Sequence, residues 1–204
     1  YDIYKFFLGN FEPGFTHWSL RLGFIFPTSL CARIFGFNEF ALTLFPLICS
    51  IANIFLIYAF AKLLFTERIA LYAAFLLSFF PLDVFFATMV FLDGPLSLFM
   101  GLVVFYFLKG EMQHKTRYYL LSGFWLGLAY LTRLTGLYIT LFLLIYAIIK
   151  KKLKLQYGLI ILAFLSLVFL EWGYYSLKTG NPVYRFSVVT KTPDIMRQLG
   201  EKRT

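Results

Sequence analysis

Long stretches without charge constrain the fold of this chain more than any other feature. Residues 40–61 contain no Lys, Arg, Asp or Glu, and the stretches 94–108, 118–132 and 134–149 are likewise uncharged. Only 14% of the residues are charged and 60% are hydrophobic, whereas about a quarter of the residues in soluble domains are charged. Because stretches of this length and composition are typical of helices in lipid, we expect an all-α, polytopic helical membrane protein.

The order of apolar and polar segments divides the chain into three parts. We expect residues 1–39 to belong to a first extracytoplasmic loop that holds an amphipathic helix at the membrane interface. Residues 40–174 form the transmembrane core, and residues 175–204 begin an extracytoplasmic or C-terminal region after the turn signal Gly180-Asn181-Pro182. The expected helices of the core are about 40–61, 69–87, 94–108, 118–131, 136–149 and 155–174.

The basic residues between these helices indicate the orientation of the chain. The connector 88–93 has no basic residue. Three other connectors carry Lys62 and Arg68; Lys109, Lys115 and Arg117; and Lys150, Lys151, Lys152 and Lys154. Positive connectors stay on the cytoplasmic side, so the net charge of +9 is explained by topology and we expect no nucleic-acid partner. The connector 88–93 then faces outward, and we expect an integral protein of the plasma (inner) membrane with its site outside.

Arg133 interrupts an apolar run that extends from residue 118 to residue 149. One helix over this run would be about 48 Å long, against about 30 Å of hydrocarbon, and it would place two basic connectors on opposite sides. Two short helices that turn at "LTRLTG" avoid both problems and put Arg133 at a recessed turn open to the outer face. Asp93, at the start of another short helix, is expected to be recessed in the same way.

Three segments carry a resemblance to a known family: "HWSLRLGFIFPTSLCARIFGFNEFALTLFPLICS", "FFPLDVFFATMVFLDGPLSLFM" and "LSGFWLGLAYLTRLTGL". They resemble the polyprenol-dependent C-type glycosyltransferases, especially the dolichyl-phosphate-mannose protein mannosyltransferases and the bacterial aminoarabinose transferases, over about residues 1–150. The resemblance implies a C-type glycosyltransferase-like transmembrane core. It also implies inverting transfer of a sugar from a polyprenyl-phosphate carrier to a lipid, protein or glycan acceptor on the outer face.

The same resemblance implies a catalytic Asp in the first outer loop, after a first span that this sequence lacks. We therefore expect the chain to be a fragment that is inactive alone, with its general base upstream of Tyr1. Asp2 is the acidic residue nearest to that point, although its spacing suits the role poorly. Ser19 stands where some members of the family carry an acidic residue that contacts metal or sugar.

The candidates for binding the lipid phosphate are Arg133, Arg21 and His17. The planar guanidinium keeps its charge and offers several donors to phosphate oxygens. Each candidate also has a simpler explanation. Arg133 can be a snorkelling cation, Arg21 can contact lipid headgroups, and His17, beside Trp18, can anchor the chain at the interface.

Asp93 and Asp83 are the candidates for contacts with the sugar or with a divalent metal, the one cofactor that the sequence leaves open. Asp93 precedes Gly94-Pro95 and equally suits an N-cap. Asp83 and Glu171 lie near the ends of their spans, where each can simply pair with an Arg or Trp group.

Two other classes of protein remain open. In a transporter or channel, recessed charged hairpins would line a permeation path, although no inverted repeat is visible. In a membrane scaffold without catalytic activity, Arg133→Ala would leave any activity of the protein unchanged.

Overall fold

The structure is a computed structural model that describes residues 2–8, 20–150 and 154–190. The regular structure in these ranges is helical, which confirms the all-α prediction. The elements follow one another as α1 Asp2–Phe7, α2 Leu22–Phe35, α3 Glu39–Leu64, α4 Glu67–Ser78, α5 Pro81–Ala87, α6 Asp93–Gln113, α7 Thr116–Thr132, the 3-10 helix η1 Leu134–Tyr138, α8 Ile139–Ile149 and α9 Tyr157–Thr179.

Within the described ranges, three helices, α3, α6 and α9, are long and apolar enough to cross a membrane, and the bent pair α4 and α5 makes a fourth if it counts as one span. These helices expose large apolar side chains on their outer faces, among them Phe55 of α3 and Leu170 of α9. Such surfaces are stable in contact with lipid but not with water. The prediction of a polytopic helical membrane protein is therefore confirmed.

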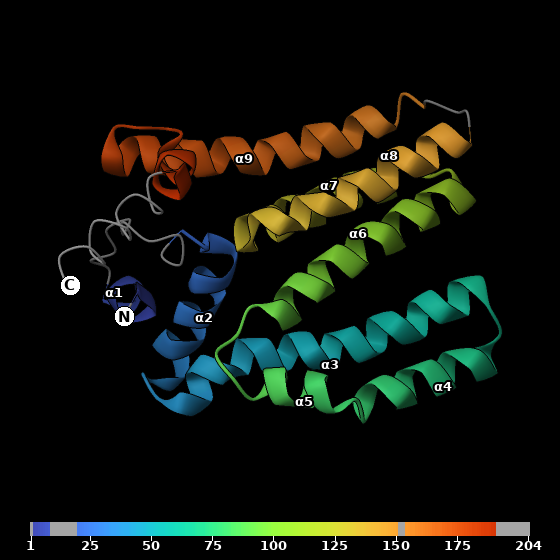
Figure 1. Cartoon of the computed structure of the whole chain (residues 1–204), viewed down its shortest axis with the longest axis horizontal. Helices are drawn as coiled ribbons and strands as arrows, with labels where there is room; N and C mark the ends of the chain where they lie inside the picture. The colour runs from blue at the N-terminus through green and yellow to red at the C-terminus, as the bar shows by residue number, and fades with distance from the viewer. Residues whose placement is uncertain (1, 9–19, 151–153, 191–204) are drawn as a thin grey trace, which may run out of the picture.

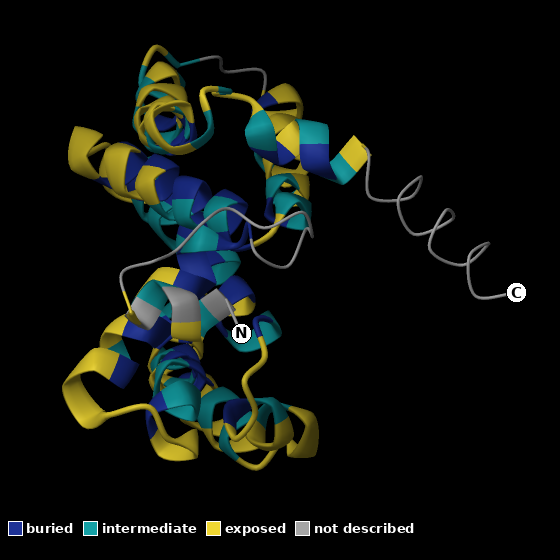
Figure 2. Cartoon of the chain, turned by 90° about the vertical axis from the view of Figure 1, so that its left-hand side faces the viewer, coloured by how far each residue is buried: buried dark blue, intermediate teal, exposed yellow. Residues whose placement is uncertain are grey.

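Helix α7 is central to the bundle because it packs against both α6 and α9. On the other side of α6 lies α3, which also contacts α4 and α5, while α2 crosses the ends of α3 and α7 (Figure 1). Figure 2 shows that the buried residues follow the middle of this bundle, with exposed residues towards both sides. Helices from distant parts of the sequence thus meet at the end of the bundle covered by α2.

Two glycines one turn apart bring α7 and α9 into close contact. A Cβ atom at Gly123 would collide with the backbone of Ile160, and one at Gly127 would collide with the side chain of Leu167. This spacing of small residues is a common means of close helix packing in membranes. On the side of α7 that faces α6, the Ser122 hydroxyl donates a hydrogen bond of 2.9 Å to the carbonyl oxygen of Val103.

The expected single helix over 69–87 is wrong, because the chain bends by 59° between α4 and α5. Pro81 is the first residue of α5. Proline has no backbone N–H and its ring clashes with a preceding helical turn, so a helix continues poorly through it. The bend moves Asp83 onto a short separate helix.

The turn at "LTRLTG" is present at the expected place. Helix α7 ends at Thr132, Arg133 is extended, and η1 leads into α8, which runs back and contacts α6. A Cβ atom at Gly136 would lie 2.8 Å from the carbonyl oxygen of Ala129, so the turn folds tightly against the end of α7. Arg133 is thereby held at the end of the bundle near α2.

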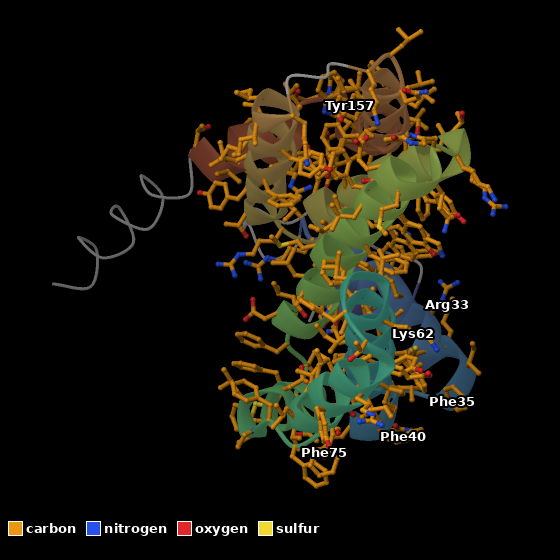
Figure 3. All side chains as sticks on the ribbon, turned by 90° about the vertical axis from the view of Figure 1, so that its right-hand side faces the viewer. Arg33, Phe35, Phe40, Lys62, Phe75 and Tyr157 are labelled. Carbon is orange, nitrogen blue, oxygen red and sulfur yellow. The ribbon has the colours of Figure 1, made fainter. Side chains whose placement is uncertain are left out.

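The opposite end of the bundle is held together by Glu111. Its carboxylate accepts hydrogen bonds from Lys154 Nζ at 2.9 Å, from the Tyr119 hydroxyl at 2.8 Å and from the Tyr157 hydroxyl at 3.2 Å. Figure 3 views this end and labels Tyr157. The cluster joins α6, α7 and the start of α9 in the region of the basic connectors.

Candidate functional site

A polar cavity of about 200 Å³ lies where α2 begins and α7 ends. Its lining residues are Leu20, Arg21, Arg133, Leu134, Thr135, Arg185 and Val189. The three arginines come from three segments that are far apart in the sequence. These are the residue before α2, the turn after α7 and the helical segment 184–190 after α9.

Arg21 is the N-cap residue of α2, and only 8% of it is exposed. The pKa of Arg21 is lowered to about 10, chiefly by burial and then by the positive charges of Arg133 and Arg185, while the charge of Asp93 acts in the opposite direction. Arg21 therefore remains protonated at neutral pH, and the other charges of the cavity act directly on it. A buried cation crowded by other cations favours an anion nearby.

Arg133 is the most accessible of the three arginines. Its Nη1 donates a hydrogen bond of 3.3 Å to Oδ1 of Asp93, and the two side chains are 44% and 40% exposed. Asp93 is the first residue of α6 and the N-cap position belongs to Leu92, so the N-cap interpretation of Asp93 is wrong. A tertiary contact with Arg133, 40 residues away in the sequence, has taken the place of the local cap.

Arg185 is held by α7 and α9. Its Nη1 donates a hydrogen bond of 2.8 Å to Oε1 of Glu171, and its Nη2 donates one of 2.9 Å to the carbonyl oxygen of Tyr130. The guanidinium also lies 4.6 Å from the centroid of the Tyr130 ring. A guanidinium has five N–H donors, so donors remain after these two bonds.

Nothing in the sequence pointed directly to Arg185. The one available signal was Glu171, because an acidic residue in an apolar span needs a cationic partner. The interpretation that Glu171 pairs with an arginine agrees with the structure. Neither spacing nor periodicity could have singled out Arg185 among the basic residues of the C-terminal region.

A larger apolar cavity of about 540 Å³ adjoins the polar one. It is lined by Phe6, Leu22, Gly23, Phe26, Pro27, Phe99, Leu128, Leu131, Leu167, Leu170, Glu171 and Tyr174, mostly from α2, α7 and α9. Neighbouring residues line the two cavities: Leu22 follows Arg21 in the chain, and Glu171 of the apolar cavity binds Arg185 of the polar one. A cationic region and an apolar region thus lie next to each other.

Asp83 lies elsewhere. Its Oδ2 accepts a hydrogen bond of 2.5 Å from the Ser50 hydroxyl, and it lines a separate cavity of about 390 Å³ together with Asn53 and Ser97. In the described part of the chain, no three His, Cys, Asp or Glu residues are grouped so that they could hold a metal ion. The divalent metal therefore stays a prediction, and the structure does not bring Asp83 and Asp93 together.

Three residues named from the sequence cannot be placed at the cavity. His17 and Ser19 lie outside the described residues. Asp2 begins α1, but its side chain also lies outside them.

The fold and the cavities together define a polytopic helical membrane protein with a cationic site at one end of its bundle. The family described as dolichyl-phosphate-mannose-protein mannosyltransferase matches residues 22–175. This match spans most of the chain, and the chain belongs to that family, as the resemblance indicated. It is thus a membrane protein of a glycosyltransferase family that uses lipid-phosphate sugars. No curated protein and no solved structure matches the chain significantly.

Proposed function

We propose that the chain carries the donor-phosphate site of a membrane glycosyltransferase. The enzyme transfers a sugar from a polyprenyl-phosphate carrier, with inversion, to a protein, lipid or glycan acceptor on the extracytoplasmic face. The observation that carries this proposal is the convergence of Arg21, Arg133 and Arg185 on one cavity.

The chemistry of the transfer explains why cations are needed there. The bond between the sugar C1 and the phosphate oxygen breaks, and its electron pair stays on that oxygen. The acceptor oxygen or nitrogen bonds to C1 from the opposite face and loses its proton to a general base, which we assign to no described residue. Guanidinium N–H groups at the phosphate stabilise the negative charge that develops as the bond breaks.

The adjoining apolar cavity supports a lipid phosphate over a free phosphate as the ligand. Leu22, Leu131 and Leu170 are among its lining residues, and they come from three different helices. Each CH₂ group of an isoprenoid chain that leaves water for such a surface contributes about 0.8 kcal/mol. A carrier whose headgroup lies at Arg21 would have its chain beside α2, between α7 and α9.

The distribution of charge supports a site on the outer face. The polar cavity lies at the end of the bundle where α6 begins, whereas Lys109, Lys115 and Lys154 lie at or beyond the other end of α6. Positive connectors stay in the cytoplasm. The three arginines of the cavity would then face the extracytoplasmic side.

Carrier binding by purified protein tests the proposal independently of the general base. Farnesyl phosphate, a short polyprenyl monophosphate, should bind, and Arg133→Ala or Arg21→Ala should weaken its binding about tenfold or more, since each removes a charge-assisted contact. The matched control is Arg68→Ala, an exposed arginine at the other end of the bundle, which should bind normally. Unchanged binding by both cavity variants would contradict the proposal. Transport of a labelled solute without sugar transfer would instead favour a transporter.

A further inference from the structure

The two ion pairs beside the polar cavity differ in strength and exposure. Arg185 and Glu171 are 2.8 Å apart and almost fully buried. Arg133 and Asp93 are 3.3 Å apart and nearly half exposed. Exposed pairs contribute little free energy, because solvent screens the charges and the side chains lose freedom when they pair. Asp93 therefore holds Arg133 loosely, whereas Glu171 holds Arg185 firmly.

We infer that Asp93 competes with the lipid phosphate for Arg133 and thereby limits how tightly the spent carrier is bound after transfer. This inference rests on the proposed function. The oxygens of a phosphate can accept two parallel N–H bonds from one guanidinium, which is stronger than a single long contact. The phosphate of the carrier can thus displace Asp93 from Arg133, and Asp93 returns when the carrier leaves.

The charges of the cavity explain why such a competitor is useful. Arg21, Arg133 and Arg185 with Asp93 and Glu171 leave one net positive charge. The donor, a phosphodiester, carries one negative charge and matches it. The spent carrier is a phosphomonoester that carries about 1.5 to 2 negative charges at neutral pH. With Asp93 ionised, the cavity matches the donor better than the product.

The local structure leaves Asp93 room to move away. It is the first residue of α6, and the N-cap position of that helix belongs to Leu92. The Asp93 side chain is 40% exposed, so open space lies beside it. The N-terminus of α6 also favours a negative charge at this position, so the carboxylate keeps a stabilising interaction when Arg133 turns to the phosphate.

Asp93→Asn tests the inference because it removes the charge but keeps the shape of the side chain. The purified full chain is titrated with farnesyl phosphate, with inorganic phosphate and with a polyprenyl-phosphate sugar. We expect Asp93→Asn to bind farnesyl phosphate about tenfold more tightly, since a screened charge at this distance contributes on that order. Binding of the donor should change less than threefold. If Asp93→Asn binds both farnesyl phosphate and inorganic phosphate more tightly, the inference is supported and the phosphate group alone is the ligand. If it binds only farnesyl phosphate more tightly, the inference is supported and the lipid chain is required for binding.

Two variants serve as controls. Asp93→Glu keeps the charge and should not tighten binding, and Asp83→Asn removes a carboxylate from the separate cavity of α5 and should have no effect. Unchanged or weaker binding of farnesyl phosphate by Asp93→Asn, with the variant eluting as a folded, monodisperse species, would overturn the inference and make Asp93 a residue that positions Arg133.

The Arg133→Ala variant separates this failure from a failure of the proposed function. If Arg133→Ala loses affinity for farnesyl phosphate while Asp93→Asn gains none, only the competition is refuted. If Arg133→Ala binds farnesyl phosphate as tightly as the native chain does, the cavity is not the phosphate site and both proposals fall.

Discussion

Arg185 Nη1 and Glu171 Oε1 are 2.8 Å apart, and the two side chains are 5% and 0% exposed. This pair joins the helical segment 184–190 to α9, and the second bond of Arg185, to the Tyr130 carbonyl, joins it to α7. Two charges buried together remain stable only while each compensates the other. One wall of the polar cavity thus depends on an ion pair that water does not reach.

Glu171→Ala should destabilise the protein by about 3–5 kcal/mol, because it leaves the Arg185 guanidinium buried without its anionic partner. Thermal unfolding of the purified variant in detergent measures the effect. The matched control is Glu67→Ala, which breaks the exposed pair with Lys62 at 2.7 Å and should leave the unfolding temperature unchanged. An equal change in unfolding temperature for the two variants would show that the buried pair contributes no more to stability than the exposed pair.

Arg185→Lys should weaken binding of farnesyl phosphate about tenfold while retaining most of the stability. Lysine keeps the positive charge beside Glu171, but it cannot hold Glu171, the Tyr130 carbonyl and a phosphate oxygen at once as the planar fork can. Titration with the monophosphate and thermal unfolding of the same sample separate the two effects. A parallel loss of stability and binding would assign Arg185 a structural role only.

The sequence was sufficient to predict a recessed turn at Arg133 and a recessed Asp93, but not that the two side chains form an ion pair. A charge in the middle of an apolar run that is too long for one helix indicates a turn. In the structure, α7 ends at Thr132 and the turn follows at Arg133. Asp93, by contrast, stands in a local pattern that favours an N-cap. Local rules describe hydrogen bonds within one turn of a helix, whereas the packing of α6 beside α7 decides which distant charge the carboxylate meets.

Arg185 and the bend before α5 illustrate what the sequence left undetermined. The partner of Glu171 depends on how the chain folds back after α9, and neither hydrophobic periodicity nor charge counting describes that path. The bend at Pro81 had a visible cause, but proline also occurs inside helices of this chain, as Pro46 does in α3 and Pro27 in α2. Composition alone cannot distinguish a tolerated proline from one that ends a helix.

Gly123→Ala and Gly127→Ala should each destabilise the bundle by about 1–3 kcal/mol, because the added methyl group forces α7 away from α9. Gly173→Ala is the matched control, since a Cβ atom there would meet nothing within 4 Å. Thermal unfolding of the three variants in one detergent gives the comparison. If Gly173→Ala lost as much stability as the others, close packing of α7 against α9 would not explain the result, because alanine is otherwise the better helix former.

Single cysteines test the side of the membrane on which the cavity opens. In a variant without Cys31 and Cys49, Thr135→Cys places a thiol at the arginine cavity, and Lys115→Cys places one in the exposed basic connector at the other end of α6. In intact cells or oriented vesicles, a membrane-impermeant maleimide should label Thr135→Cys from outside, and Lys115→Cys only after permeabilisation, because positive connectors stay in the cytoplasm. Farnesyl phosphate should slow labelling at Thr135→Cys and leave the rate at Lys115→Cys unchanged, since a ligand held by Arg21 and Arg133 covers the first thiol alone. The opposite labelling pattern would place the cavity on the cytoplasmic face, where an extracytoplasmic acceptor could not reach it.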